Sequence, residues 1–359
     1  MAVFFAPGRT ELAGNHTDHQ NGRVLASAVG LGLMAEVEKN SSKKAIVESN
    51  GYKKFEISLN NLSPRAEEYG SSSALIRGMI ASFKDLGLKI GGFTASISST
   101  LPAGSGLSSS AAFSVLIGKI LNGLYNDGSV DPVVIARCAQ RSENEFFGKP
   151  CGLMDQMASS VGKCVYIDFK TNEITPIVAD FESLGLTLCL TDTGGSHAGL
   201  SSSYARIPAD MKYIASLFDA SVLGDVNPKD FYAKGWSKED RPVRRAMHFF
   251  GENERVPKMR DALIANDGDE YMRLMNESGR SSEELLNNII TSATGDTKLS
   301  DGLALSRKLL DGKGAWRVHG GGFAGCVQAL MPSDYFIEYK HEMEKVFGEN
   351  SCYEIKTLI

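Results

Sequence analysis

Residues 101–112 read Leu-Pro-Ala-Gly-Ser-Gly-Leu-Ser-Ser-Ser-Ala-Ala, a run rich in glycine and serine. Before this run, residues 93–99 alternate apolar and polar side chains, which predicts a half-buried strand. After it, residues 113–125 carry apolar side chains at helical spacing, and the glycine at 128 favours a helix stop. The run is therefore predicted to connect a strand to the start of a helix.

A glycine-rich turn at a helix start can bind an anion, because the first helical turn has free N–H groups and the positive end of the dipole. Gly104 and Gly106 have no Cβ, so the backbone can close around a phosphate, and the serines add hydroxyl groups. The pattern predicts phosphate binding; a plain glycine turn with a serine helix cap is the alternative. Neither a GK[ST] ending nor a Rossmann GxGxxG is present, since Ser109 stands at the third glycine position.

Composition indicates a soluble globular protein of 359 residues, with 42% hydrophobic and 23% charged side chains and room for two domains. The net charge of −5, without a basic block, argues against nucleic acid as a partner. Six cysteines without a CxxC pair indicate reduced thiols in a cytoplasmic protein, not a zinc site or a disulfide framework. The start of the sequence does not resemble a signal peptide, and no apolar run reaches the ~18 residues of a membrane span.

The chain is predicted to divide near residue 180 into domains 1–180 and 181–359. A strand at 3–6 is expected to end at Pro7-Gly8, and a polar loop from Arg9 to Gly22 follows, which composition alone assigns equally to a solvated loop or to a site. A hairpin is expected around Asn50-Gly51. Further strands are predicted at 24–29, 31–38, 45–48, 54–59, 164–169, 174–178, 186–192, 327–331 and 352–356. Helices are predicted at 71–86, 132–147, 153–161, 204–220, 243–250, 258–266, 270–277, 283–290, 304–310 and 335–347.

Five segments, in order, resemble the motifs of one family. Residues 7–18 resemble the galactokinase signature GRxNLIGEHTDY, and residues 101–112 resemble the PxGxGLSSSAA phosphate loop of the wider GHMP small-molecule kinases. Residues 150–156 resemble the galactokinase PCGxMDQ, residues 277–282 its ESHxSL, and residues 319–326 the third GHMP motif, GGGFGGC. The resemblance extends over residues 3–331, which is most of the chain.

This resemblance implies an α+β GHMP kinase fold, with an S5-like N-terminal domain, a ferredoxin-like C-terminal domain and the active site in the cleft. It implies ATP-dependent phosphorylation of galactose at its C1 hydroxyl, with a small sugar as substrate. A monomer or weak homo-oligomer is expected. The resemblance assigns Asp155 as the base or charge partner of that hydroxyl, and Arg9 as its neighbour. The residue types fit these roles, because a helix dipole and an arginine both favour an ionised carboxylate.

The remaining site residues also follow from the resemblance. Mg²⁺ prefers hard oxygen ligands, which points to Glu143 and to Ser110 or Ser109. The residues expected to bind ATP are Gly104, Ser105, Gly106, Leu107, Ser108, Ser109 and Ser110. The residues expected to bind the sugar are Asn15, His16, Asp18, Gly152 and Tyr204.

Three residues depart from the family pattern, and one of them bears on the substrate. Asn15 stands where the signature has a glutamate that reaches the C6 end of galactose, His19 replaces a tyrosine, and Ala324 replaces a glycine. Because Asn15 carries no charge, a C1 kinase of a sugar altered at C6, such as galacturonate, is an alternative. A second alternative, from another class, is a non-catalytic sugar and ATP sensor.

Overall fold

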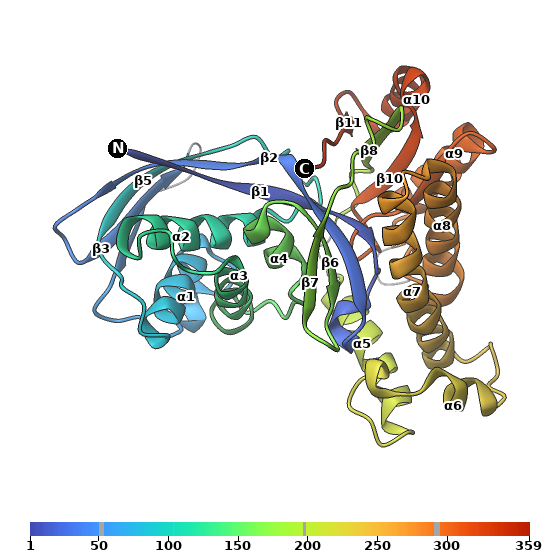
Figure 1. The fold of residues 1–359 in the computed structure, drawn as a ribbon, viewed down its shortest axis with the longest axis horizontal. Helices are drawn as coiled ribbons and strands as arrows, with labels where there is room; N and C mark the ends of the chain where they lie inside the picture. Colours follow the sequence, from blue (N-terminus) through green and yellow to red (C-terminus); the bar gives the residue numbers. More distant parts are fainter. Residues whose placement is uncertain (50–53, 103, 197–198, 291–294) are drawn as a thin grey trace. The chain divides into compact units, whose positions relative to one another are not determined.

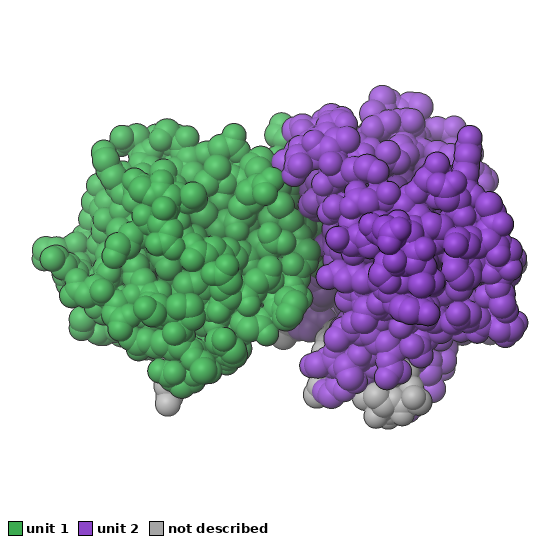
Figure 2. All heavy atoms as spheres, turned by 90° about the horizontal axis from the view of Figure 1, so that it is seen from below, with its two compact units in different colours: residues 1–9, 28–102, 107–163 green, residues 10–27, 103–106, 164–359 purple. Residues whose placement is uncertain are grey.

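The computed structural model describes residues 1–49, 54–102, 104–196, 199–290 and 295–359. The chain folds into two compact units, which Figure 2 colours separately. Unit 1 comprises residues 1–9, 28–102 and 107–163, and unit 2 comprises residues 10–27, 103–106 and 164–359. The prediction placed one boundary near residue 180, whereas each unit consists of three segments of the chain. Two long strands, β1 (Ala2–Ala13) and β2 (Arg23–Lys39), each begin in one unit and end in the other.

Unit 1 contains a sheet covered by helices (Figure 1). Its strands follow the order β4 (Phe55–Ser58), β3 (Lys44–Ser49), β5 (Phe93–Ser99) and β2, and β1 pairs with β2. Its helices are α1 (Ser72–Asp85), α2 (Ser109–Tyr125), α3 (Pro132–Arg141), the π-helical segment Ser142–Phe147 and α4 (Met154–Val161). A short 3-10 helix spans Ala66–Glu68.

The alternation predicted for β5 is confirmed, because Phe93, Ala95 and Ile97 are buried in the core of unit 1. Apolar side chains of α1, α2 and α3 complete that core. The start predicted for α3 is also confirmed: Asp131 caps the helix by accepting a hydrogen bond from the Val133 N–H at 2.7 Å. Strands β3 and β4 pair as predicted, whereas the turn at Asn50-Gly51 lies outside the described residues.

Unit 2 contains the first part of β2 paired with β6 (Cys164–Asp168), which pairs in turn with β7 (Glu173–Ile177). A separate antiparallel sheet has the order β11 (Cys352–Glu354), β8 (Leu186–Asp192), β10 (Cys326–Pro332) and β9 (Ala315–Val318). The helices of unit 2 are α5 (Ser201–Ser216), α6 (Pro228–Ala233), α7 (Arg241–Ile264), α8 (Gly268–Ser281), α9 (Lys298–Leu310) and α10 (Phe336–Phe347). Short 3-10 helices span Asp18–Gln20, Leu223–Asp225 and Ser333–Tyr335, and a π-helical segment, Ser282–Leu286, follows α8.

Two predictions about unit 2 helices were wrong. The separate helices expected at 243–250 and 258–266 are one continuous helix, α7, with Pro257 inside it. Burial of side chains on both sides of Pro257, such as Val256 and Met259, outweighs the lost hydrogen bond. The segment 278–282, expected to separate two helices, is itself helical because Ser278 and Ser281 are buried and hydrogen-bonded within unit 2.

The first strand is also longer than predicted, since β1 continues through Pro7-Gly8 to Ala13. Gly8 lies against the loop of unit 1, where an added Cβ would come within 2.9 Å of the Leu107 carbonyl oxygen. The next residue, Arg9, donates its backbone N–H to that same oxygen at 3.1 Å. Gly8 therefore allows β1 to pass close to Leu107 and does not end the strand. This contact fixes the position of the Arg9 backbone on β1.

Candidate active site

An arginine and an aspartate that are 146 residues apart form the centre of the site in unit 1. Arg9 lies on β1, and Asp155 lies in the first turn of α4. Arg9 Nε is 2.6 Å from Asp155 Oδ1 and Nη2 is 3.0 Å from Oδ2, a bidentate pair. The arginine side chain is 7% exposed and that of the aspartate 24%, so the carboxylate stays accessible while its partner is buried.

Ser108 makes a third contact to this carboxylate, with its hydroxyl 2.5 Å from Asp155 Oδ2. Its backbone has a φ of 58°, and its side chain does not cap α2, which leaves the hydroxyl for Asp155. Burial alone would raise the pKa of Asp155, but the charge and hydrogen bonds of Arg9 and the hydrogen bond from Ser108 lower it below its ordinary value. Asp155 is therefore ionised at neutral pH.

A second carboxylate lies beside the start of α2. Glu143 Oε2 accepts a hydrogen bond from the Ser110 hydroxyl at 3.1 Å, and Oε1 accepts one from Gln156 Nε2 at 2.9 Å. The Lys149 ammonium stands 3.7 Å from Glu143 Oε2. Burial raises the pKa of Glu143, which Lys149 and the two hydrogen bonds partly oppose. Ser110 and Glu143, the two residues predicted to hold a metal, are thus brought together.

The glycine-rich loop passes from unit 2 to unit 1 between Gly106 and Leu107. Gly104 and Gly106 have φ values of +75° and +67°, which favour glycine. In unit 2 the carbonyl oxygen of Ser105 accepts hydrogen bonds from Cys326 Sγ at 3.3 Å and from the Tyr353 hydroxyl at 3.2 Å. The loop backbone is therefore held by the chain itself, whereas its binding of phosphate stays a prediction.

Asn15, in unit 2, is fully buried and uses its side-chain amide within the protein. Its Nδ2 donates to the Gly320 carbonyl oxygen at 2.6 Å and to Glu11 Oε1 at 3.1 Å. Its Oδ1 accepts from Asn288 Nδ2 at 3.0 Å and from the Ser282 hydroxyl at 3.3 Å. An amide offers two donors and two acceptor sites, so these contacts account for all of them.

His16 belongs to a chain of side-chain hydrogen bonds. Its Nε2 lies 3.0 Å from the Gly321 carbonyl oxygen, which can only accept, so Nε2 carries the proton. Its Nδ1 must then accept from His19 Nε2, 3.2 Å away, and His19 Nδ1 accepts from Gln20 Nε2 at 3.1 Å. Both ring nitrogens of His16 are thus engaged by the protein. Burial lowers the pKa of His16 to about 3 and that of His19 to about 4.

The other residues predicted to bind the sugar are divided between the units. Gly152 lies in unit 1, in the turn before α4. In unit 2, Asp18 Oδ1 accepts from the His19 backbone N–H at 2.8 Å, and the Tyr204 hydroxyl donates to the Gly322 carbonyl oxygen at 2.6 Å. Burial raises the pKa of Tyr204 to about 12, which keeps the phenol neutral.

Several residues that complete these networks were not predicted. Lys149 and Gln156 contact Glu143, and their only sequence signal was their position beside or within the PCGxMDQ-like segment. In unit 2 the buried Arg317 pairs with Glu11. No periodicity or spacing links residues 11 and 317, so this pair has no signal in a single sequence.

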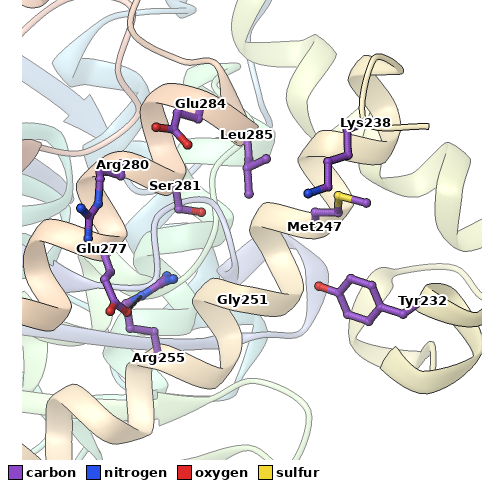
Figure 3. Close-up of a pocket in the computed structure, with 10 residues that line it drawn as sticks. All are labelled: Tyr232, Lys238, Met247, Gly251, Arg255, Glu277, Arg280, Ser281, Glu284 and Leu285. Carbon is purple, nitrogen blue, oxygen red and sulfur yellow. Dashed lines mark ion pairs between the residues drawn. The ribbon is translucent and has the colours of Figure 1, made fainter. Parts of the chain in front are cut away.

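Helices α7 and α8 also border an open pocket in unit 2, with a volume of about 610 Å³ (Figure 3). Figure 3 shows Arg255 and Glu277 close together on one side, with Tyr232 and Lys238 facing them. Arg255 also pairs with the buried Glu252, which accepts a hydrogen bond from the Gly14 backbone N–H at 3.0 Å. The pocket wall therefore supports the segment that resembles the galactokinase signature.

Comparison with known proteins identifies the family of this chain. Residues 74–163 match the model of the GHMP kinases N terminal domain, and residues 2–39 match the galactokinase galactose-binding signature. The galactokinase of Clostridium acetobutylicum is 30% identical over 98% of this chain and 90% of its own length. That of Clostridium tetani is 29% identical over 97% of this chain and 88% of its own length.

The chain belongs to the galactokinase family. Among solved structures, the galactokinase of Lactococcus lactis, complexed with galactose, superposes with a TM-score of 0.87 at 24% identity, covering 99% of this chain and 93% of that one. The mevalonate kinase of Methanococcus jannaschii superposes with a TM-score of 0.69 at 18% identity, covering 100% and 98%. The predicted GHMP kinase fold and the resemblance to galactokinases are thus confirmed. Among the described residues, no helix has the length and apolar character that a membrane span requires.

Proposed function

We propose that this protein transfers the γ-phosphoryl group of ATP to the C1 hydroxyl of galactose, giving galactose 1-phosphate and ADP. Membership of the galactokinase family supports a sugar kinase that uses ATP. The cluster of Arg9, Asp155 and Ser108 is the main structural support for this chemistry. The Asp155 carboxylate is ionised, is held by three hydrogen bonds and is still partly exposed.

Asp155 would accept a hydrogen bond from the C1 hydroxyl and take its proton as the O–P bond forms. Its lowered pKa makes it a modest base, which suits an anomeric hydroxyl because that group is more acidic than an ordinary alcohol. Arg9 would hold the carboxylate in place and stabilise negative charge on the transferring phosphoryl group. Such positioning and electrostatic stabilisation supply most of the catalysis in phosphoryl transfer.

The residues around Glu143 fit a divalent cation that arrives with the nucleotide. Ser110 and Glu143 offer hard oxygen atoms 3.1 Å apart, and the Lys149 ammonium already stands beside the carboxylate as a cation. Gln156 Oε1 is buried and has no hydrogen-bond partner among the described residues. No group of three His, Cys, Asp or Glu side chains gathers in the described part of the chain, so phosphate oxygens and water would complete the coordination. When bound, Mg²⁺ would neutralise charge on the triphosphate.

The decisive experiment is steady-state ADP release by the purified protein with MgATP and a panel of sugars that includes galactose and galacturonate. Galactose is expected to give the highest kcat/KM, and Asp155→Asn is expected to abolish the signal. If the folded protein binds galactose, as measured by calorimetry, but releases no ADP, it is the non-catalytic sugar and ATP sensor instead. A folded protein that turns over galacturonate but not galactose would identify the C6-altered substrate.

A further inference from the structure

The segment that resembles the galactokinase signature carries two departures that belong together. In GRxNLIGEHTDY an asparagine precedes a glutamate by four positions. Aligned from Gly8 onward, this chain has Glu11 at the asparagine position and Asn15 at the glutamate position. The two residue types are therefore both present, in exchanged order.

The structure brings these two side chains into direct contact. Asn15 Nδ2 is 3.1 Å from Glu11 Oε1 and 3.4 Å from Oε2. Glu11 is near the end of β1, and Gly14 turns the chain with a φ of +96°, which brings Asn15 back towards residue 11. Both residues are buried, at 2% and 0% exposure, so neither is solvated by bulk water.

The carboxylate of the pair faces a buried cation. Arg317, which is 0% exposed, forms an ion pair with Glu11 Oε1. Its Nη1 donates to the carbonyl oxygen of Leu12 at 3.0 Å, and its Nε donates to that of Val318 at 3.2 Å. The neighbouring carboxylate, Glu252, pairs with Arg255, and the charge of Arg317 also helps to lower the pKa of Glu252. Removing the charge of residue 11 would leave a buried guanidinium without its carboxylate, a costly arrangement.

The orientation of the Asn15 amide follows from the same network. Its Nδ2 faces two acceptors, the Glu11 carboxylate and the Gly320 carbonyl oxygen, and its Oδ1 faces two donors, from Asn288 and Ser282. The opposite orientation would set oxygen against oxygen and nitrogen against nitrogen. The amide thus has no hydrogen-bonding capacity left for a ligand.

We infer that Glu11 and Asn15 are an exchanged pair that keeps one carboxylate and one amide in the network opposite Arg317. Glutamate is one methylene longer than asparagine, so the exchange conserves the summed length of the two side chains as well as their charge. Asn15 is accordingly a positioning residue, and its lack of charge indicates no preference for an acidic sugar. Only this last consequence depends on the proposed sugar kinase function.

A double-mutant cycle tests the pair without any substrate. Urea unfolding is measured for the wild type, Glu11→Asn, Asn15→Glu and the double variant E11N/N15E. Each single variant is expected to raise the unfolding equilibrium constant about a hundredfold or more, because one removes the carboxylate that pairs with Arg317 and the other buries a second carboxylate beside Glu11. The double variant is expected to return within about tenfold of the wild type, since the charges balance again.

Two results would overturn the inference: an Asn15→Glu variant as stable as the wild type, or a double variant no more stable than the worse single one. If neither single variant folds, recovery of folded double variant supports the pair, and its failure to fold refutes it. Glu11→Gln, which keeps the side-chain length and removes the charge, is expected to be destabilised as well.

The role of residue 15 in sugar preference is tested by kinetics with galactose and galacturonate, using the variants that fold. The ratio of kcat/KM for galactose and galacturonate is expected to stay within about threefold of the wild type in the double variant. A folded Asn15→Glu variant that shifts this ratio tenfold or more would show that residue 15 contacts the sugar. Failure of the proposed function would instead appear as absent turnover in the wild type, with the stability cycle unchanged.

Discussion

Lowering the pH from 6.5 to 5 is expected to destabilise the folded protein through His16 and His19. The hydrogen-bond chain from Gln20 through both rings to the Gly321 carbonyl oxygen requires two neutral imidazoles, because every ring nitrogen in it already donates or accepts. A further proton on either ring would break a link of the chain. Burial correspondingly lowers the pKa values to about 3 and about 4.

The sign of this effect follows from proton linkage. Both pKa values lie below the ordinary value of 6.5 in the folded protein, so the unfolded chain binds more protons between pH 6.5 and about 4. The stabilisation is fully present above pH 6.5 and is lost as the pH falls. At about 1.4 kcal/mol per proton and pH unit, the loss by pH 5 is at most about 2 kcal/mol for each histidine, because both rings are partly exposed. His248, which is fully buried and also has a lowered pKa, acts in the same direction.

Urea midpoints measured at pH 7, 6.5, 6, 5.5 and 5 give the assay, since most carboxylates of the unfolded chain are still ionised there. In His19→Gln the amide can still donate to His16 Nδ1 but no longer titrates, so the loss of stability between pH 6.5 and 5 is expected to shrink by up to about 2 kcal/mol. His341→Gln, at an exposed position on α10, is the matched control and should leave the pH profile unchanged. Equal profiles for the wild type and His19→Gln would refute the assignment of neutral rings.

Three further outcomes are expected. Asp155→Asn should lower kcat with galactose at least about a hundredfold in protein that is still folded, and a loss below tenfold would remove Asp155 from the chemical step. Its urea midpoint should also fall, because the buried Arg9 guanidinium loses its carboxylate. Glu143→Gln should raise the Mg²⁺ concentration that gives half-maximal activity about tenfold and leave the KM for galactose unchanged; a changed galactose KM alone would contradict the assignment. Gly322→Ala should cost more than about 3 kcal/mol of unfolding free energy, because its Cβ would lie 2.1 Å from the Asn288 carbonyl oxygen at a φ of +79°. Its neighbour Gly320→Ala, with a φ of +69° and nothing within 4 Å, should cost only about 1–2 kcal/mol.

The parts of the fold that were predictable are those that local chemistry decides. The start of α3 follows from Asp131-Pro132, and the buried face of β5 follows from its alternation. The continuity of α7 was not predictable, because Pro257 is a local stop signal that tertiary burial overrides. The length of β1 was missed for a related reason, since Pro7-Gly8 signals a turn until the contact with Leu107 is known.

The same distinction applies to the candidate site. Arg9 and Asp155 were paired only through the family resemblance, because residues 146 positions apart leave no periodic signal in one sequence. Lys149 was overlooked because a single lysine beside a motif is usually a solvated side chain; its position 3.7 Å from Glu143 is visible only in the fold. The hydrogen-bond saturation of Asn15 likewise depends on partners from segments that are distant in the chain.

When all hydrogen-bonding groups of a substituted residue are already used within the protein, its departure from a family signature needs a different interpretation. A substituted residue alters substrate choice directly only when it has a donor, an acceptor or a charge left to offer. Asn15 has none left, and His19 is engaged at both ring nitrogens, by His16 and Gln20. These two departures are each matched by partners in unit 2: Glu11 for Asn15, and the His16 ring and the Gln20 amide for His19. Compensation of this kind predicts that restoring the signature residues singly will destabilise the protein before it changes any sugar preference.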